Sequence, residues 1–320
     1  MKILTHILAF ALLLTCARPN VAWAQSVEIK QRWIAGKKYF QTVQTDQQSS
    51  FAVGPQKMEQ TMKMTMEISL AVRPHEDGQR KRLTLRYDRV AVQMKMNAQE
   101  MSYDSAKSGE GTDPMGFGKT MGATVGKELI LLLNAQDEIT EIENYEDFLK
   151  QLGSSPVPGM DPRQMYSREA LSQMLKQGAL LAMPPQKVTP GTSWPFANEI
   201  ILPQIGKIGV SGTYTFKGLA ERGGAACAEI ATDAKLSMDL SGPTEAGATP
   251  NPATQLKMKV TDGTLKGTVW FDPALGQARD AQLTQEMTLS MQNPTDPSAT
   301  ITMPMKQNIS TMLTKVEDLK

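Results

Sequence analysis

Apolar and polar residues alternate with a period of two along much of this chain. The longest run spans Thr61–Val72, and its apolar positions are Met62, Met64, Met66, Ile68, Leu70 and Val72. Strict alternation is typical of a β-strand that has one face on an apolar core and the other face in solvent. At about 3.3 Å per residue, the predicted strand is roughly 40 Å long, well above the usual strand length.

A turn and a return strand follow this run. Asp77-Gly78 is a dipeptide that favours a tight hairpin turn, and alternation resumes over Leu83–Met96. Near Asp88 the apolar positions change parity, from Leu83, Leu85 and Tyr87 to Val90, Val92, Met94 and Met96. One extra residue in a strand produces such a change, so the sequence predicts a β-bulge that bends this strand.

The C-terminal part repeats the pattern. Alternating segments are predicted at 256–260, 265–271, 283–291 and 301–309, with a turn at Asp262-Gly263. Thr213–Lys217 and Ala226–Ile230 are shorter strand candidates. The two strand-rich parts resemble each other in style, but no residue-level repeat relates them.

The middle of the chain has helical features. Tyr145–Leu152 and Arg163–Leu181 lack runs of β-branched residues, and Asp161-Pro162 is a helix-start signal. We therefore predict a mainly β (α+β) fold, with long antiparallel strands in a curved sheet or open barrel and one or two mid-chain helices packed on it. Residues 25–320 are expected to form one large domain, in which two strand-rich halves, 25–143 and 190–320, can be joined by a helical segment, 144–185.

The N-terminus has the features of an export signal. Lys2 supplies a positive start, Ile3–Thr15 is mostly apolar, and Ala22-Trp23-Ala24 fits the small-x-small site of signal peptidase. We expect residues 1–24 to be removed and the mature protein to be periplasmic or extracellular. Leu13-Leu14-Thr15-Cys16 is a poorer match to the lipidation site of bacterial lipoproteins, because Thr15 stands where a smaller residue is expected. Lipid anchoring through Cys16 is thus the less favoured alternative.

Charge and hydropathy argue against nucleic-acid binding and against a transmembrane helix. The net charge of the chain is +1, and removing Lys2 and Arg18 with the signal changes it to −1. Nucleic-acid binding requires clustered Lys and Arg that neutralise phosphates, so it is not expected. No segment of the mature chain is long and apolar enough for a transmembrane helix, and the longest apolar run, Leu129–Leu133, has the length of a strand.

The sequence shows no catalytic or metal-binding motif. Gly118-Lys119-Thr120 resembles the end of a phosphate-binding loop, but Asp113 stands where that motif requires glycine, which favours a Gly-rich loop. His75 is expected in an exposed turn, and Cys227 is expected to be a buried, inert thiol. Four isolated carboxylates are further candidates without distinguishing context: Asp88, Asp104, Glu229 and Asp272. We predict a protein that is not an enzyme and has no cofactor or metal.

Methionine is unusually abundant, with 21 residues in the chain. Because Met is a flexible core filler, ordinary core packing is the simplest interpretation. A Met-rich face also suits adaptable binding of an apolar ligand, whereas Met-x-Met spacing in an exported protein can supply soft sulfur ligands to Cu(I). The candidate ligand-binding residues are those of the two alternating strands: Met62, Met64, Met66, Ile68, Leu70, Met94 and Met96.

Several short motifs resemble a family of exported bacterial proteins classed as a domain of unknown function. They are Gly36-Lys37-Lys38-Tyr39, Tyr103-Asp104-Ser105, Pro184-Pro185 followed by Trp194, and Gly212–Phe216. The resemblance implies no catalytic residues. More distantly, long strands with central helices are similar to the periplasmic lipoprotein carriers of the Lol type, which implies a curved sheet whose apolar concave face is covered by helices.

Together these features favour a non-enzymatic envelope protein that binds a hydrophobic ligand, such as a lipid, in an apolar cavity of the sheet. The alternative is a structural or protein-interaction protein with a solid core and no ligand.

Overall fold

The computed structural model describes most of the chain after the predicted signal. The described residues are 26–53, 56–107, 113, 117–152, 168, 171, 183–184, 186–202, 206–239, 258–293 and 296–320. The predicted signal segment 1–24 lies outside the described residues, and so does nearly all of the predicted helix 163–181.

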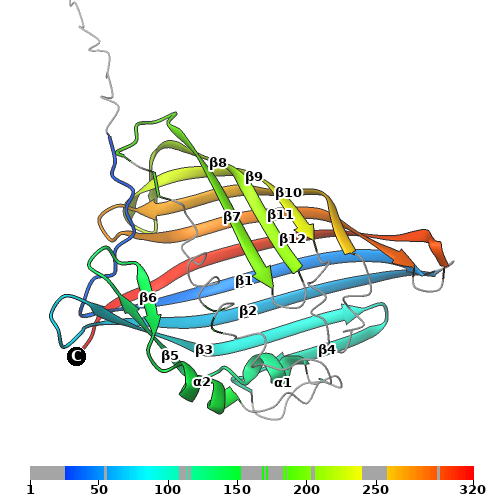
Figure 1. The fold of residues 1–320 in the computed structure, drawn as a ribbon, viewed down its shortest axis with the longest axis horizontal. Coiled ribbons are helices and arrows are strands. Elements are labelled where there is room, and N and C mark those ends of the chain that lie inside the picture. The colour runs from blue at the N-terminus through cyan, green and yellow to red at the C-terminus, as the bar shows by residue number, and fades with distance from the viewer. Residues whose placement is uncertain are drawn as a thin grey trace, which may run out of the picture.

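Within the described residues, twelve strands and two helices form the fold (Figure 1). Their bounds are β1 (Lys37–Val53), β2 (Gln56–Pro74), β3 (Lys81–Met96), β4 (Gln99–Asp104), α1 (Phe117–Gly122), β5 (Glu128–Leu133), β6 (Ile139–Ile142), α2 (Tyr145–Leu152), β7 (Ser193–Leu202), β8 (Gly206–Arg222), β9 (Ala225–Asp239), β10 (Met258–Asp272), β11 (Gln277–Asn293) and β12 (Asp296–Asp318). Most strands are far longer than average.

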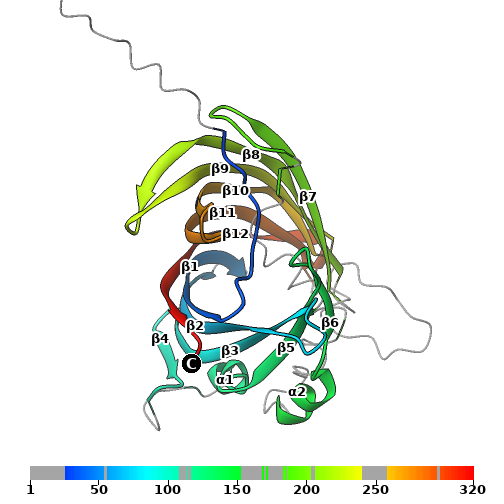
Figure 2. The same ribbon diagram turned by 90° about the vertical axis from the view of Figure 1, so that its left-hand side faces the viewer.

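All twelve strands belong to one antiparallel sheet. Their order is β6-β5-β3-β2-β1-β12-β11-β10-β9-β8-β7, and β4 pairs with the other end of β3. The first and last long strands, β1 and β12, therefore meet in the middle of the sheet and join the two strand-rich parts of the chain. Figure 2 shows that the sheet curls strongly but does not close, which confirms the predicted mainly β fold with a curved sheet and helices.

The register confirms the strongest predictions from the alternation. The Thr61–Val72 pattern lies inside β2, and the segment 75–80 connects β2 to β3 in a hairpin. The register of these strands shifts between Glu67 and Ile68, opposite Arg89 and Tyr87, so the predicted bulge is present at Asp88. Because of this bulge, the apolar residues of β3 on both sides of Asp88 share one face of the sheet.

One prediction about the C-terminal part was wrong. Asp262-Gly263 does not turn the chain but lies inside β10, where the register shifts between Thr261 and Thr264. A Cβ atom at Gly263 would lie 2.7 Å from Leu236 Cβ, so glycine here permits close approach of β9. The strand candidates Thr213–Lys217 and Ala226–Ile230 are confirmed as strand, and they lie within β8 and β9, which are much longer than predicted.

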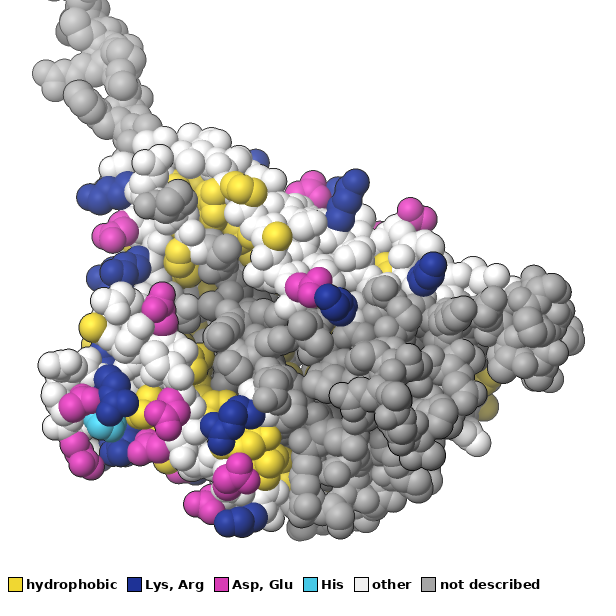
Figure 3. Space-filling model, viewed as in Figure 1, with side chains coloured by type: hydrophobic (Ala, Val, Ile, Leu, Met, Phe, Trp, Pro, Cys, Tyr) yellow, Lys and Arg dark blue, Asp and Glu magenta, His cyan; other side chains and the backbone are white. Residues whose placement is uncertain are grey.

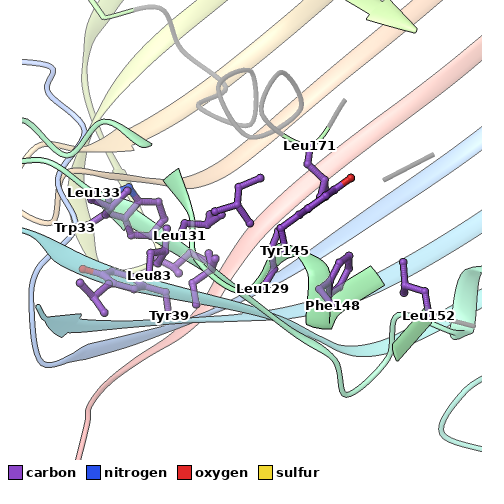
Figure 4. Close-up of a cluster of buried hydrophobic side chains, with 14 residues drawn as sticks. Trp33, Tyr39, Leu83, Leu129, Leu131, Leu133, Tyr145, Phe148, Leu152 and Leu171 are labelled. Carbon is purple, nitrogen blue, oxygen red and sulfur yellow. The ribbon is translucent and has the colours of Figure 1, made fainter. Parts of the chain in front are cut away.

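Two clusters of buried side chains occupy the concave face, which we call the inner face. One involves β7 to β11 and includes Phe216, Ile230 and Phe271. The other involves β1, β2, β3, β5 and α2, and Figure 4 shows Phe148 and Tyr145 of α2 facing this cluster. The apolar side of α2 explains its position, because burial of that side is what stabilises so short a helix.

The N-terminal segment 26–36 crosses one end of the curved sheet and connects the two clusters. Val27 pairs with Val188 beside the first cluster, and Trp33 packs in the second. Between them, the Arg32 amide donates to the Gly276 carbonyl at 2.9 Å, and the Gly36 amide donates to the Val72 carbonyl at 2.8 Å. This end of the sheet, at the left of Figure 1, we call the closed end.

Candidate ligand-binding face

The inner face continues beyond the clusters along the middle of the long strands. On β2, the side chains of Met62, Met64, Met66 and Ile68 are only half-buried. Met66 lies directly between Val43 of β1 and Val90 of β3. Directly opposed residues of an antiparallel pair share a face, so these side chains form a continuous apolar surface.

The structure brings the sequence-predicted residues together on this surface. Met94 and Met96 of β3 lie opposite Met62 and Gln60 of β2, and both are half-buried. Leu70 differs from the others because it is only 6% exposed and belongs to the second cluster. Six of the seven predicted residues thus lie on an accessible apolar surface, and Leu70 lies where that surface meets the core.

The same face carries further apolar residues on β11 and β12, which were not chosen from the sequence and are separated from the methionines of β2 by polar residues of β1 such as Gln47. Met305 of β12 pairs with Ser49 of β1 on one side and with Met287 of β11 on the other. Met303 lies opposite Leu289, and Ile309 opposite Leu283. The alternation of β12 was visible in the sequence, but its position next to β1 depends on a pairing between the two ends of the chain.

Met101 of β4 was missed altogether. It lies opposite Met94 and is 8% exposed. The strand β4 spans only Gln99–Asp104, which is too short for an alternating pattern to indicate it.

Two clefts among the described residues are lined mainly by polar residues of the outer, convex side of the strands. The first, about 550 Å³, is lined mainly by two polar rows that cross β1 to β4. The rows are Gln44, Thr65, Ala91 and Asp104, and Asp46, Lys63, Gln93 and Ser102. The second, about 560 Å³, lies over β1, β2, β12 and β11.

An ion-pair network lies at the end of the first cleft. The Arg89 guanidinium donates two hydrogen bonds to Asp104, at 2.9 and 2.7 Å, and one to Glu67 at 2.9 Å. Arg89 holds the pKa of the Asp104 carboxyl at about 2, below its usual range. Since Arg89 is already bound by two carboxylates, the network joins β2, β3 and β4 rather than offering a free cation.

The structure gives another role to the glycines of the segment that resembles a phosphate-binding loop. Gly118 and Gly122 belong to the helix α1, not to a loop, and both face Tyr103 of β4. A Cβ atom at Gly118 would lie 2.3 Å from Tyr103 Cβ, and one at Gly122 would lie 2.0 Å from Tyr103 Oη. The glycines therefore allow α1 to pack on the Tyr103 ring.

His75 and Cys227 occupy structural positions. His75 lies in the β2–β3 hairpin, but its side chain is only 13% exposed and its Nδ1 lies 3.1 Å from Asp77 Oδ2, so the expected exposed histidine was wrong. Cys227 of β9 is fully buried, as predicted, and burial raises the pKa of its thiol.

The four candidate carboxylates lie on separate strands, and three of them accept hydrogen bonds from arginine. Asp88 is bound by Arg86, Asp104 by Arg89, and Asp272 by Arg279, whereas Glu229 lies opposite Trp270. Among the described residues, no group of three or more His, Cys, Asp and Glu side chains could hold a metal ion. No helix in the described part of the chain is long and apolar enough to cross a membrane.

Solved structures similar to this chain are distant from it. A lipovitellin structure described for its lipid–protein interactions is 12% identical, covers 90% of this chain and has a TM-score of 0.46; this chain spans 26% of that protein. A putative outer membrane lipoprotein-sorting domain from Vibrio parahaemolyticus is 8% identical, with 87% and 85% of the two chains covered and a TM-score of 0.13. OpdQ of Pseudomonas aeruginosa is 7% identical, with 90% and 100% covered and a TM-score of 0.21.

Sequence comparison gives the family, as the motifs of the chain predicted. No curated protein matches the chain. Residues 78–277 match the model of DUF6263, a family of unknown function. The matched segment runs from the β2–β3 hairpin to the start of β11 and includes more than half of the sequence. The chain therefore belongs to the DUF6263 family.

Proposed function

We propose that this protein is an exported, non-enzymatic binding protein of the cell envelope, and that it holds an apolar ligand such as a lipid against the inner face. One observation carries the proposal. The inner face is fully buried at the closed end, but the same strands present half-buried Met62, Met64, Met66, Met303 and Met305 farther along. Apolar surface that the fold leaves partly accessible is a common mark of a binding site.

The chemistry of this surface supports a ligand rather than a reaction. Its side chains are mainly thioethers and aliphatic groups, with neutral polar side chains such as Gln47 between them. The charged residues of the same strands, such as Lys63, Lys95 and Lys306, alternate with them on the outer face. Methionine is flexible and polarisable, so a Met-lined surface adapts to acyl chains of different shapes.

Native mass spectrometry of the mature protein, purified from the periplasm or the medium of its host, tests this proposal. We expect a chain that begins at Gln25 and carries a stoichiometric adduct, which organic extraction then identifies as a lipid or another apolar molecule. A mass that equals the bare chain Gln25–Lys320 would instead support the alternative function, a structural or partner-binding protein without a ligand.

A pair of lysine substitutions locates the ligand. Met64→Lys places a charge on the inner face, and we expect it to abolish the adduct because a buried charge strongly disfavours an apolar ligand. Thr61→Lys adds the same side chain to the outer face of the same strand, where Thr61 is exposed, and should leave the adduct intact. Equal adducts in both variants would place the ligand elsewhere.

A further inference from the structure

Three methionines lie side by side on three neighbouring strands of the inner face. Met94 of β3 lies directly opposite Met62 of β2 on one side and directly opposite Met101 of β4 on the other. Among the described strands, no other row has methionines on three adjacent strands. Directly opposed residues share a face, so the three thioethers of this row lie on the same side of the sheet.

The surroundings of the row are apolar or neutral. Met64 and Met96 lie two positions away on β2 and β3, and Gln60 donates from its side-chain amide to Met94 Sδ at 3.7 Å. The nearest charged residues of these strands, Lys63, Lys95 and Glu100, lie on the outer face, where Lys95 and Glu100 pair with each other at 3.3 Å. The charged side chains next to this row therefore point away from the sulfur atoms, to the other face of the sheet.

The residue types of this row are those that bind a soft metal ion, and all three lie on one face. Thioether sulfur selects Cu(I) over the hard divalent cations, which prefer oxygen. Directly opposed Cβ atoms are about 4.5–5.5 Å apart, and the flexible Met side chain can bring neighbouring sulfur atoms closer than that. We propose that Met62, Met94 and Met101 form a thioether site for a soft monovalent cation, with Cu(I) as the ion.

The three methionine side chains of the site differ in their exposure to solvent. Met101 is 8% exposed, whereas Met62 and Met94 are half-buried. An ion can thus enter from the accessible side and be held against the buried sulfur. Met62 and Met94 also belong to the face proposed for the apolar ligand, so a bound Cu(I) ion and an apolar ligand would exclude each other at this row. The two proposals are tested separately, because Cu(I) titration requires no apolar ligand.

Titration of the mature protein with Cu(I) under anaerobic conditions, against a colorimetric Cu(I) chelator, tests the site. We expect a single Cu(I) per chain, with sulfur as the nearest neighbour in X-ray absorption spectra. Ag(I), which is also soft but does not change oxidation state, should bind at the same place. If the chelator removes all Cu(I) from the wild-type protein, the proposal is wrong.

Matched variants then locate the ion. Met94→Leu removes the central thioether but conserves side-chain volume, so the protein should fold and Cu(I) affinity should fall by more than about tenfold. The double variant Met287→Leu/Met305→Leu removes two thioethers from the same face, at a place where only two methionines are adjacent, and should keep wild-type affinity. Equal affinity of Met94→Leu and the wild type, or equal losses in both variants, would overturn the assignment.

Discussion

The two ends of the inner face are formed by the same strands, but the side chains at the two ends are buried to different degrees. At the closed end, Tyr39 and Val72 are completely buried, and the rings of Trp33 and Tyr39 meet edge to face with centroids 5.5 Å apart. Farther along β2, the side chains of Met62, Met64 and Met66 are half-buried on the same face. The closed end is covered by the N-terminal segment and by α2, so burial depends on what packs against a strand and not on the strand alone.

The difference separates a part of the molecule that stabilises the fold from the part that we propose for ligand binding. Aromatic and aliphatic residues that are fully buried contribute most to stability, whereas half-buried methionines contribute less and can contact a ligand. The following predictions test this comparison, beginning with the largest expected effect.

The largest effect is expected from truncation at the closed end. Tyr39→Ala removes a side chain with no exposed surface and should lower the free energy of unfolding by about 3–5 kcal/mol. Met66→Ala, in the half-buried part of the face, should lower it by only about 1–2 kcal/mol. Urea denaturation followed by circular dichroism measures both. Similar losses in the two variants would show that the two ends do not differ in their contribution to stability.

The packing of α1 near the Met-rich part should show an intermediate effect. Gly122→Ala would place a Cβ atom 2.0 Å from Tyr103 Oη and should lower the free energy of unfolding by about 1–3 kcal/mol. Tyr103→Leu removes the atoms that clash, so the double variant should be more stable than the sum of the two single losses implies. Strict additivity in this double-mutant cycle would contradict the contact.

The ion pair on the outer face predicts a smaller, pH-dependent effect. Because the pKa of Asp104 is about 2 in the folded protein and near 3.8 in the unfolded chain, its contribution is present above pH 4 and is lost as the pH falls through 2. Asp104→Asn should lower the free energy of unfolding by about 1 kcal/mol at pH 7, a small value because the pair is partly solvated. It should also flatten the pH dependence between pH 4 and 2, which acid titrations of stability can measure.

The smallest effect is expected at Cys227 of β9. Its thiol is fully buried, and burial raises its pKa, with the charge of Asp272 acting in the same direction. A thiol reagent at pH 8 should therefore label the native protein very slowly and label it rapidly in urea. Rapid labelling of the native protein would indicate that the sheet opens at β9.

Sequence patterns predicted the structure correctly where that structure depends only on residues close together in the chain. Alternation indicated β2, the parity change indicated the bulge at Asp88, and the composition of Tyr145–Leu152 indicated α2. Each of these signals depends on neighbours within one strand or one helix turn. The alternation also placed six candidate residues on one accessible surface, although it could not show where that surface becomes core at Leu70.

Glycines were misinterpreted because their role depended on another part of the chain. Gly263 appeared to belong to a turn and Gly118 to a loop, but both permit close approach, of Leu236 and Tyr103 respectively. Asp-Gly and Gly-Lys-Thr have the same sequence whether they turn, bind phosphate or pack, and only the contacting residue separates these roles. Met101 was missed for a different reason, since β4 is too short to show an alternating pattern.

The sequence by itself determined that long strands form, which residues share a face on each strand, and that one face is apolar, because alternation with a period of two is a local property of extended backbone. Only the tertiary structure decided that β1 pairs with β12, that Met62, Met94 and Met101 form one row, and that the closed end is covered. The reason is physical: register and curvature arise from contacts between residues far apart in the chain, and no local pattern specifies them.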